Sequence, residues 1–327
     1  MVQPNELKSG FPIEIPGNKK IPATRVWELL WATYKGNLEV VRNFISEEPN
    51  LAYAQYNYMP PIHLAVREGH LELVSYLLSL GAYDPSYRNY RFRDSLEVIA
   101  EDSGYVPIAE ELSDYAKESS RQQFEGDYGR IHFPRSEDGQ HFEDAVDQND
   151  LAIVESILKQ HPEFAKDETY FWGEGILMMP AKEAQYGMID LLISYGATVP
   201  SILKWTQAYY FEQYDGAAYM LKNGMSPNVM NCHHVTILHD MAQKGDIAKL
   251  QLLLQFGANI EAIDEEYKST PLGLAARWGQ VEAVNYLLDH GADPGKGGRS
   301  WSTPLAWSKK KGHDTIVEIL EKAGASQ

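Results

Sequence analysis

The most reactive side chains gather in one short stretch, where Cys232, His233 and His234 are followed by His239 and Asp240. A thiol beside imidazoles could bind zinc, or it could act as a nucleophile with a histidine as its base. Neighbouring side chains on an extended segment diverge, however, and no second cysteine is spaced to share a metal. We therefore predict no metal, no cofactor and no catalytic residue, and keep a metal-dependent hydrolytic site around Cys232, His233 and His234 as the alternative.

Other catalytic signatures are missing from the sequence. It contains no glycine-rich phosphate loop, no nucleophile elbow and no HExxH motif. Carboxylates occur in runs such as Asp264-Glu265-Glu266, and such runs usually form a solvated surface. The sequence predicts a protein that is not an enzyme.

Charge narrows the range of partners. The 327 residues include 29 Lys and Arg against 46 Asp and Glu, which gives a net charge of −17. Such a chain would be repelled by nucleic acid and by anionic membranes. The single cysteine suits a reducing compartment, and no long apolar run or signal-peptide core is present. We therefore expect a cytoplasmic protein with no nucleic-acid or membrane partner.

An internal period organises the chain that must position these residues. Thr270-Pro271-Leu272 recurs as Thr303-Pro304-Leu305, and weaker copies begin at Pro60 and Thr236. Each copy is followed nine residues later by a glycine, and twelve residues after that by a Gly-Ala pair. The residues between the two glycines have the apolar spacing of a helix. These glycines are Gly69, Gly245, Gly279 and Gly312, then Gly81, Gly257, Gly291 and Gly324.

The TPLxxA element, the single glycine and the Leu-Leu-x-x-Gly-Ala element together resemble the ankyrin repeat. The resemblance implies an all-α solenoid of stacked helix-turn-helix units with short β-hairpin fingers, and it gives His239 a role in hydrogen bonding between units. Nine units fit residues 24–325. Thr caps a helix start, and glycine between the helices adopts a left-handed turn, which we expect at Gly245 and Gly279.

Departures from the period suggest further boundaries. We expect an extended segment over residues 1–23, repeats one to three over 24–116, a polar insertion over 117–139 and repeats four to nine over 140–325. A step of only 28 residues follows Gly196. Residues 198–201 are predicted to form a tight link there.

The finger tips depart from small turn residues toward aromatic and basic ones. In a stack these tips would lie along one edge of a concave groove, where aromatic side chains often make binding hot spots. We expect Tyr90, Tyr267, Trp278 and Trp301 to be substantially exposed. The full set of groove candidates is Tyr56, Tyr58, Tyr87, Arg88, Tyr90, Arg91, Tyr170, Trp172, His233, His234, Tyr267, Trp278, Arg299 and Trp301.

These observations predict a non-catalytic module that binds another protein or peptide through its concave groove. Because the chain is acidic, a partner with a basic segment would be attracted to it. The same aromatic platforms with nearby carboxylates could instead hold a glycan, which is the second alternative. Exposure of the finger aromatics distinguishes a binding surface from packing between fingers.

Overall fold

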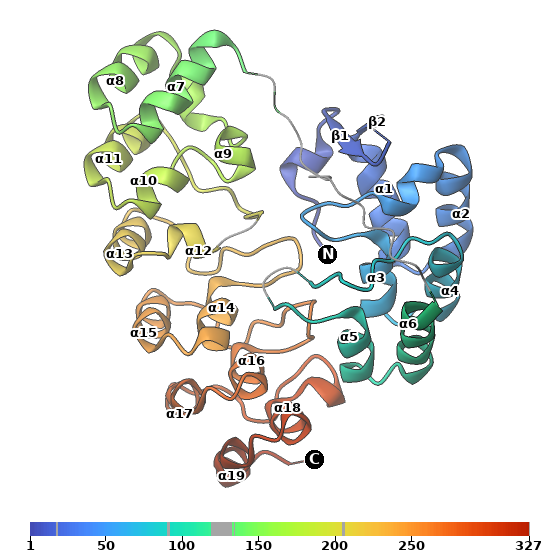
Figure 1. Cartoon of the computed structure of the whole chain (residues 1–327). Helices are drawn as coiled ribbons and strands as arrows, with labels where there is room; N and C mark the ends of the chain where they lie inside the picture. Colours follow the sequence, from blue (N-terminus) through green and yellow to red (C-terminus); the bar gives the residue numbers. More distant parts are fainter. Residues whose placement is uncertain (18, 90–91, 119–132, 134, 205–206, 327) are drawn as a thin grey trace. The chain divides into compact units, whose positions relative to one another are not determined.

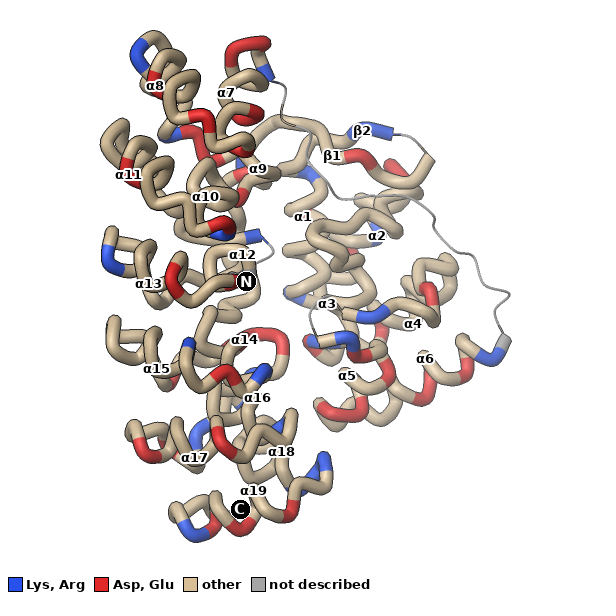
Figure 2. The backbone as a smooth tube through the Cα atoms, turned by 60° about the vertical axis from the view of Figure 1, so that its left-hand side comes forward, with Lys and Arg blue, Asp and Glu red and all other residues tan. Residues whose placement is uncertain are grey.

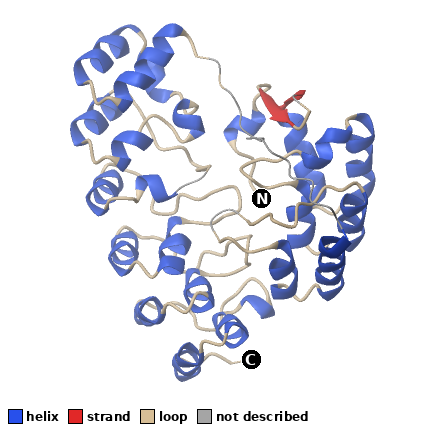
Figure 3. Cartoon of the chain, in the orientation of Figure 1, coloured by secondary structure: helices blue, strands red, loops and turns tan. Residues whose placement is uncertain are grey.

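A computed structural model describes residues 1–17, 19–89, 92–118, 133, 135–204 and 207–326. The chain divides into two compact units. The N-terminal unit comprises Asn5–His132, and the C-terminal unit comprises Phe133–Gln327 together with Met1–Pro4. Regular strands in the described residues are confined to one two-stranded sheet, and helices and loops make up the rest (Figure 3).

The N-terminal unit begins with a short turn and a hairpin. A 3₁₀ turn, η1 (Asn5–Lys8), precedes β1 (Pro12–Ile15) and β2 (Lys19–Pro22). The two strands are antiparallel, and Pro12 pairs with Pro22 at the open end. Ile13 and Ile15 are fully buried. The segment predicted to be extended thus folds back on itself, because alternate residues of β1 have an apolar core to enter.

Three helix pairs complete the N-terminal unit. In Figure 1 the inner helices α1, α3 and α5 follow one another beside the outer helices α2, α4 and α6. The bounds are α1 (Ala23–Tyr34), α2 (Leu38–Glu47), α3 (Pro61–Arg67), α4 (Leu71–Ser79), α5 (Leu96–Asp102) and α6 (Val106–Glu118), with a 3₁₀ turn, η2 (Pro49–Tyr53), after the first pair. Most of the insertion predicted at 117–139 lies outside the described residues.

The C-terminal unit continues the same pattern through six further pairs of described helices (Figure 1). The inner helices are α7 (Glu137–Asp147), α10 (Met178–Lys182), α12 (Gln207–Tyr210), α14 (Ile237–Lys244), α16 (Pro271–Arg277) and α18 (Pro304–Lys311). Their outer partners are α8 (Leu151–Gln160), α11 (Tyr186–Ser194), α13 (Tyr214–Lys222), α15 (Ile247–Gln255), α17 (Val281–Asp289) and α19 (Asp314–Lys322). The loops also hold η3 (Pro162–Lys166), α9 (Tyr170–Gly173) and η4 (Ser300–Ser302).

Local sequence explains where the inner helices start and end. The Thr270 side chain accepts a hydrogen bond from the Gly273 amide at 3.2 Å, and Thr303 caps α18 in the same way. Proline occupies the first turn of both helices, where no backbone donor is needed. Gly245 and Gly279 have φ of 71° and 73°, which confirms the left-handed turns predicted for them.

Packing between pairs forms the core. Ala275, Ala276, Val284 and Leu287 are fully buried and belong to one apolar cluster that extends from α7 to α19. Small residues on the inner helices let successive helices approach closely. Because successive inner helices stack in this way, the finger loops that precede them recur along the unit.

Candidate functional site

The fingers are the loops that join the outer helix of one pair to the inner helix of the next. In the finger before α16, Asp264 accepts hydrogen bonds from the amides of Tyr267 (2.7 Å) and Ser269 (3.0 Å). Asn231 does the same in the preceding finger, accepting from His233 (2.9 Å) and Val235 (3.1 Å). A short polar side chain at the base thus folds each loop into a compact turn.

Asp264 performs this task while fully buried. Burial raises the pKa of its carboxyl from 3.8 to about 6, although backbone hydrogen bonds from Tyr267, Ser269 and Glu266 oppose the shift. Glu266 adds a smaller repulsion that raises the pKa further. The ionised form of Asp264 is therefore unfavourable at the base of this finger, whereas the neutral amide of Asn231 carries no charge to bury.

Residues at one position of the fingers have an unusual backbone conformation. Two residues before an inner-helix cap, Tyr58, Arg93, His234 and Lys268 have φ of 60°, 60°, 57° and 52°. This left-handed region favours glycine, and other residues enter it at a cost of roughly 1–2 kcal/mol. Arg93 is exposed, and the other three are half-buried. Neither Arg93 nor Lys268 is among the groove candidates predicted from the sequence, although their spacing from the helix caps marks them.

Tyr267 lies beside this position but points inward. Only 2% of the residue's surface is exposed, so the prediction that Tyr267 is substantially exposed is wrong. It packs edge-on against Trp278 at 5.4 Å and Trp307 at 6.0 Å. The Arg277 guanidinium lies 4.3 Å from the centre of the Tyr267 ring and 4.2 Å from that of Trp278. These contacts join successive repeats and account for the burial.

Two other groove candidates are also internal. Tyr56 is buried, and its hydroxyl donates to Glu6. Tyr170 is buried against Phe142, at 5.3 Å between ring centres, and the Arg135 guanidinium lies 4.1 Å from the centre of its ring. The expectation that these aromatics line an open groove is therefore incorrect for both, because a neighbouring helix or segment covers each ring.

The remaining groove candidates divide by exposure. Arg88, Trp172 and Arg299 are exposed, and Trp172 has 58% of its surface accessible. Tyr58, Tyr87, His234, Trp278 and Trp301 are half-buried, so the expectation of substantial exposure is only partly met for the two tryptophans. His233 is buried. Tyr90 and Arg91 lie outside the described residues.

Residues of the cysteine and histidine cluster make hydrogen bonds that hold the fold together. Cys232 is buried, and its carbonyl accepts a hydrogen bond from the Val2 amide at 3.0 Å. The Thr236 amide donates to His239 Nδ1 at 3.1 Å, while His239 Nε2 donates to Ala262 O and Ser269 O. Burial lowers the pKa of this imidazole from 6.5 to about 4. His239 is therefore a neutral bridge between two fingers.

No metal centre can be assembled from the described side chains. Among these residues, no three His, Cys, Asp or Glu side chains lie close enough together to hold an ion. His234 instead faces Glu265, with 3.5 Å between Nδ1 and Oε1, and the Met1 amino group also pairs with Glu265. Within the described part of the chain, no helix combines the length and the apolar character needed to cross a bilayer.

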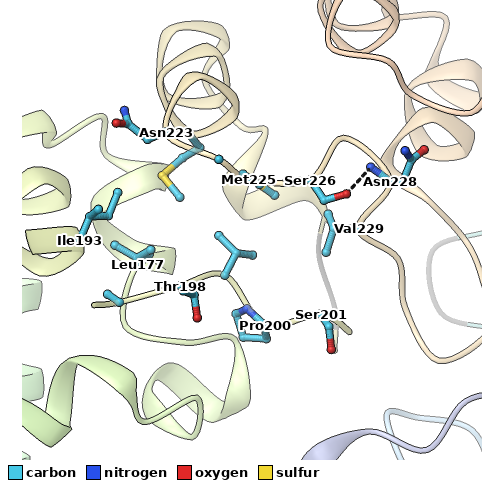
Figure 4. A pocket seen from close by; sticks show the side chains of 14 residues that line it. Leu177, Ile193, Thr198, Pro200, Ser201, Asn223, Met225, Ser226, Asn228 and Val229 are labelled. Carbon is cyan, nitrogen blue, oxygen red and sulfur yellow. Dashed lines mark hydrogen bonds between the residues drawn. The ribbon is translucent and has the colours of Figure 1, made fainter. Parts of the chain in front are cut away.

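A crevice of about 370 Å³ opens between the loops that follow α11 and α13 (Figure 4). Leu177, Met225 and Val229 form a buried floor, and polar residues such as Thr198 and Asn223 line the rim. The crevice arises at the short 28-residue step, where the sequence predicts only a tight link. Among the described residues that line it, none has a charged side chain.

Comparisons with known proteins agree with this repeated architecture. The family model described as ankyrin repeats matches residues 29–122, 205–298 and 238–327, which cover more than half of the chain. The human transient receptor potential cation channel subfamily A member 1 is 24% identical over 88% of this chain and 26% of its own length. The mouse 2-5A-dependent ribonuclease is 43% identical over 63 residues, which are 19% of this chain and 9% of its own.

The mouse ARF GTPase-activating protein GIT2 is 34% identical over 83 residues, which are 25% of this chain and 12% of its own. The chain thus spans only between 9% and 26% of the length of these relatives. The stacked helix pairs, the capped inner helices and the matches across more than half of the residues lead to one conclusion: the chain belongs to the ankyrin-repeat family.

Proposed function

We propose that this chain is a non-catalytic interaction module that binds a partner protein or peptide through its finger tips and the adjoining ends of its inner helices. Ankyrin repeats generally mediate protein–protein interaction. The observation that carries the finer proposal is the left-handed backbone at Arg93, His234 and Lys268. Glycine would relieve the strain at each position, yet a long polar side chain stands there.

Strain of this kind persists where a side chain is needed for more than folding. Trp172 supports the same interpretation, because it has φ of 61° and 58% of its surface is accessible. A large exposed aromatic in a strained turn contributes little to the core. Aromatic and arginine side chains are also the residues most often found at binding hot spots.

The chemistry of the partner follows from charge. A net charge of −17 attracts a basic segment over long range, and added salt weakens that attraction. The strained tips themselves include Arg93 and Lys268, which suit acidic groups on the partner. We therefore propose a partner with a basic segment flanked by carboxylates.

The experiment replaces strained finger residues with glycine. His234→Gly and Lys268→Gly should raise the free energy of unfolding by up to about 1 kcal/mol each while removing tip side chains. The matched controls are Asn149→Gly and Ala184→Gly. These residues have φ of 58° and 53° in the turns inside helix pairs, away from the fingers.

Denaturation in urea measures the stability of all four variants, and capture from lysate with quantitative mass spectrometry measures their partners. We expect all four to be at least as stable as the parent chain, and only the finger variants to lose captured proteins. Finger variants that retain every partner, or controls that lose the same ones, would contradict the proposal.

The alternative site around Cys232, His233 and His234 finds less support. Cys232 and His233 are buried, and the neighbouring His239 is held by backbone groups on both nitrogens. Stoichiometric zinc in the purified protein, or a glycan that binds in preference to any protein, would favour that alternative instead.

A further inference from the structure

A small hollow in the N-terminal unit has three tyrosines in its wall. Its volume is about 160 Å³, and it lies between the loop after η2 and the loop after α4. The residues that line it include Tyr53, Gln55, Ile62, Tyr83, Asp84 and Tyr87. Small-molecule sites usually measure about 300–1,000 Å³. This hollow therefore has room for one side chain rather than for an oligosaccharide or a cofactor.

The hydroxyl groups of two of these tyrosines are engaged in the surrounding fold. Tyr53 donates to Leu80 O at 2.7 Å, and the Tyr87 hydroxyl is 2.6 Å from His63 Nδ1. Tyr83 is buried, and its ring packs on that of Tyr115. With the hydroxyls held in place, the rings supply much of the apolar wall. Aromatic faces attract cations through their negative quadrupole.

The charges around the hollow have a negative balance. Asp84 lies in its wall, and Asp84 Oδ1 accepts from the amide and the hydroxyl of Ser86 at 2.8 Å each. Burial raises the pKa of Tyr83, Glu97 raises it further and Arg88 lowers it, so both charges lie near that ring. The Arg88 guanidinium donates to the carbonyls of Pro85 and Tyr87. Two carboxylates therefore oppose one guanidinium.

The surrounding helices strengthen this field. Figure 2 shows a succession of acidic residues along α5 and α6, which belong to the same unit. They include Glu97 and Glu101 on α5, and Glu110, Glu111 and Asp114 on α6. A cation that approaches this unit meets an attractive potential before it reaches the hollow.

We propose that this hollow receives the side chain of a lysine on the partner, with its methylene groups on the tyrosine rings and its ammonium group beside Asp84. The identity of the occupant rests on the proposed function, because it names the side chain that the partner presents. The site itself can be tested with small probes, without any partner and without the finger variants of the C-terminal unit.

The experiment compares two isosteric probes on the full chain by chemical-shift titration. Nα-acetyl-lysine-N-methylamide carries the ammonium group, and Nα-acetyl-norleucine-N-methylamide has the same reach without the charge. We expect the lysine probe to bind about fivefold more tightly, as is typical of a cation–π site with partial solvent access. Choline against 3,3-dimethylbutan-1-ol is a second pair that reports on a free quaternary ammonium ligand.

Variants separate the hollow from the overall charge. Asp84→Asn should bring the lysine probe to the affinity of its neutral isostere, and Arg88→Gln should tighten it. Tyr87→Phe retains the ring and should retain binding, whereas Tyr87→Leu should lose it. Asp114→Asn changes the net charge by the same amount at an exposed position on α6 and should leave the affinity unchanged.

Equal affinities for the lysine and norleucine probes would overturn the proposal. So would an Asp114→Asn variant that weakens binding as much as Asp84→Asn does, because general attraction to the acidic unit would then explain the result. Choline that binds more tightly than the lysine probe would also overturn it, in favour of a site for a free ammonium compound. None of these outcomes depends on whether the finger variants lose their partners.

Discussion

The opposed pKa shifts of Asp264 and His239 predict a pH response that two single substitutions should separate. His239, on α14, holds the next finger by hydrogen bonds to the carbonyls of Ala262 and Ser269, and Asp264 lies between those two residues in that finger. Burial lowers the pKa of His239 from 6.5 to about 4 and raises that of Asp264 from 3.8 to about 6. Each shift corresponds to about 3 kcal/mol as an order of magnitude.

The two contributions have opposite signs. Below about pH 6.5 the unfolded chain protonates His239 while the folded chain keeps it neutral, so stability is lost as pH falls from about 6.5 to 4. Below about pH 6 the folded chain keeps Asp264 protonated while the unfolded chain ionises it down to about 4. Stability is therefore lost as pH rises from about 4 to 6. In the parent chain these two effects largely offset each other.

The free energy of unfolding of Asp264→Asn, relative to that of the parent, should therefore rise by about 3 kcal/mol as the pH increases from 4 to 6.5. Asn231 shows that an amide can hold such a finger, since its single oxygen accepts from two backbone amides. His239→Gln should show the opposite slope, with its stability relative to the parent falling by about the same amount over this range.

Urea denaturation followed by circular dichroism, at fixed ionic strength from pH 4 to 7, measures these differences. Only the slope of the difference with pH is used, because each substitution also changes packing by an amount that does not depend on pH. Profiles of Asp264→Asn and the parent that run parallel would refute the raised pKa of Asp264. Parallel profiles for His239→Gln would refute the lowered pKa of His239.

Three other substitutions test the packing directly. Gly279→Val should lower the free energy of unfolding by at least about 1–2 kcal/mol. The reason is that φ is 73° at this position and an added Cβ would lie 2.8 Å from His313 Cε1. A variant as stable as the parent in urea would contradict this prediction. Tyr267→Ala should lower the free energy of unfolding by about 3–5 kcal/mol, whereas Trp172→Ala should change it little because Trp172 is largely exposed. Thermal melts compare the two variants, and similar losses of stability for both would show that exposure does not determine the effect of the substitution.

Much of the fold could be predicted from short-range chemistry. Thr270 with Pro271 defines a helix start by capping and by backbone geometry, and Gly279 defines its end. These effects act within a few residues, so they can be recognised directly in the sequence. The repeat length then follows from the spacing at which the same local motif recurs.

The orientation of the finger aromatics could not be predicted in this way. Tyr267 and Lys268 are neighbours, yet Tyr267 is buried and Lys268 is half-buried in a left-handed turn. The difference depends on hydrogen bonds to Asp264 and on Arg277 and Trp307, which come from later parts of the chain. A sequence position identifies the loop, but contacts between repeats decide which side chain faces the core.

The uneven lengths of the inner helices affect how the stack comes apart. In the C-terminal unit, α10 and α12 contain five and four residues, whereas α14, α16 and α18 contain seven or eight. Stability in a linear array is close to a sum of terms from each repeat and its nearest neighbours. The C-terminal unit should therefore lose cooperativity first in its interior, around α10 to α13, while α14–α19 stay folded. Heating would then yield a partly folded intermediate with a native C-terminal end, rather than progressive fraying from the terminus.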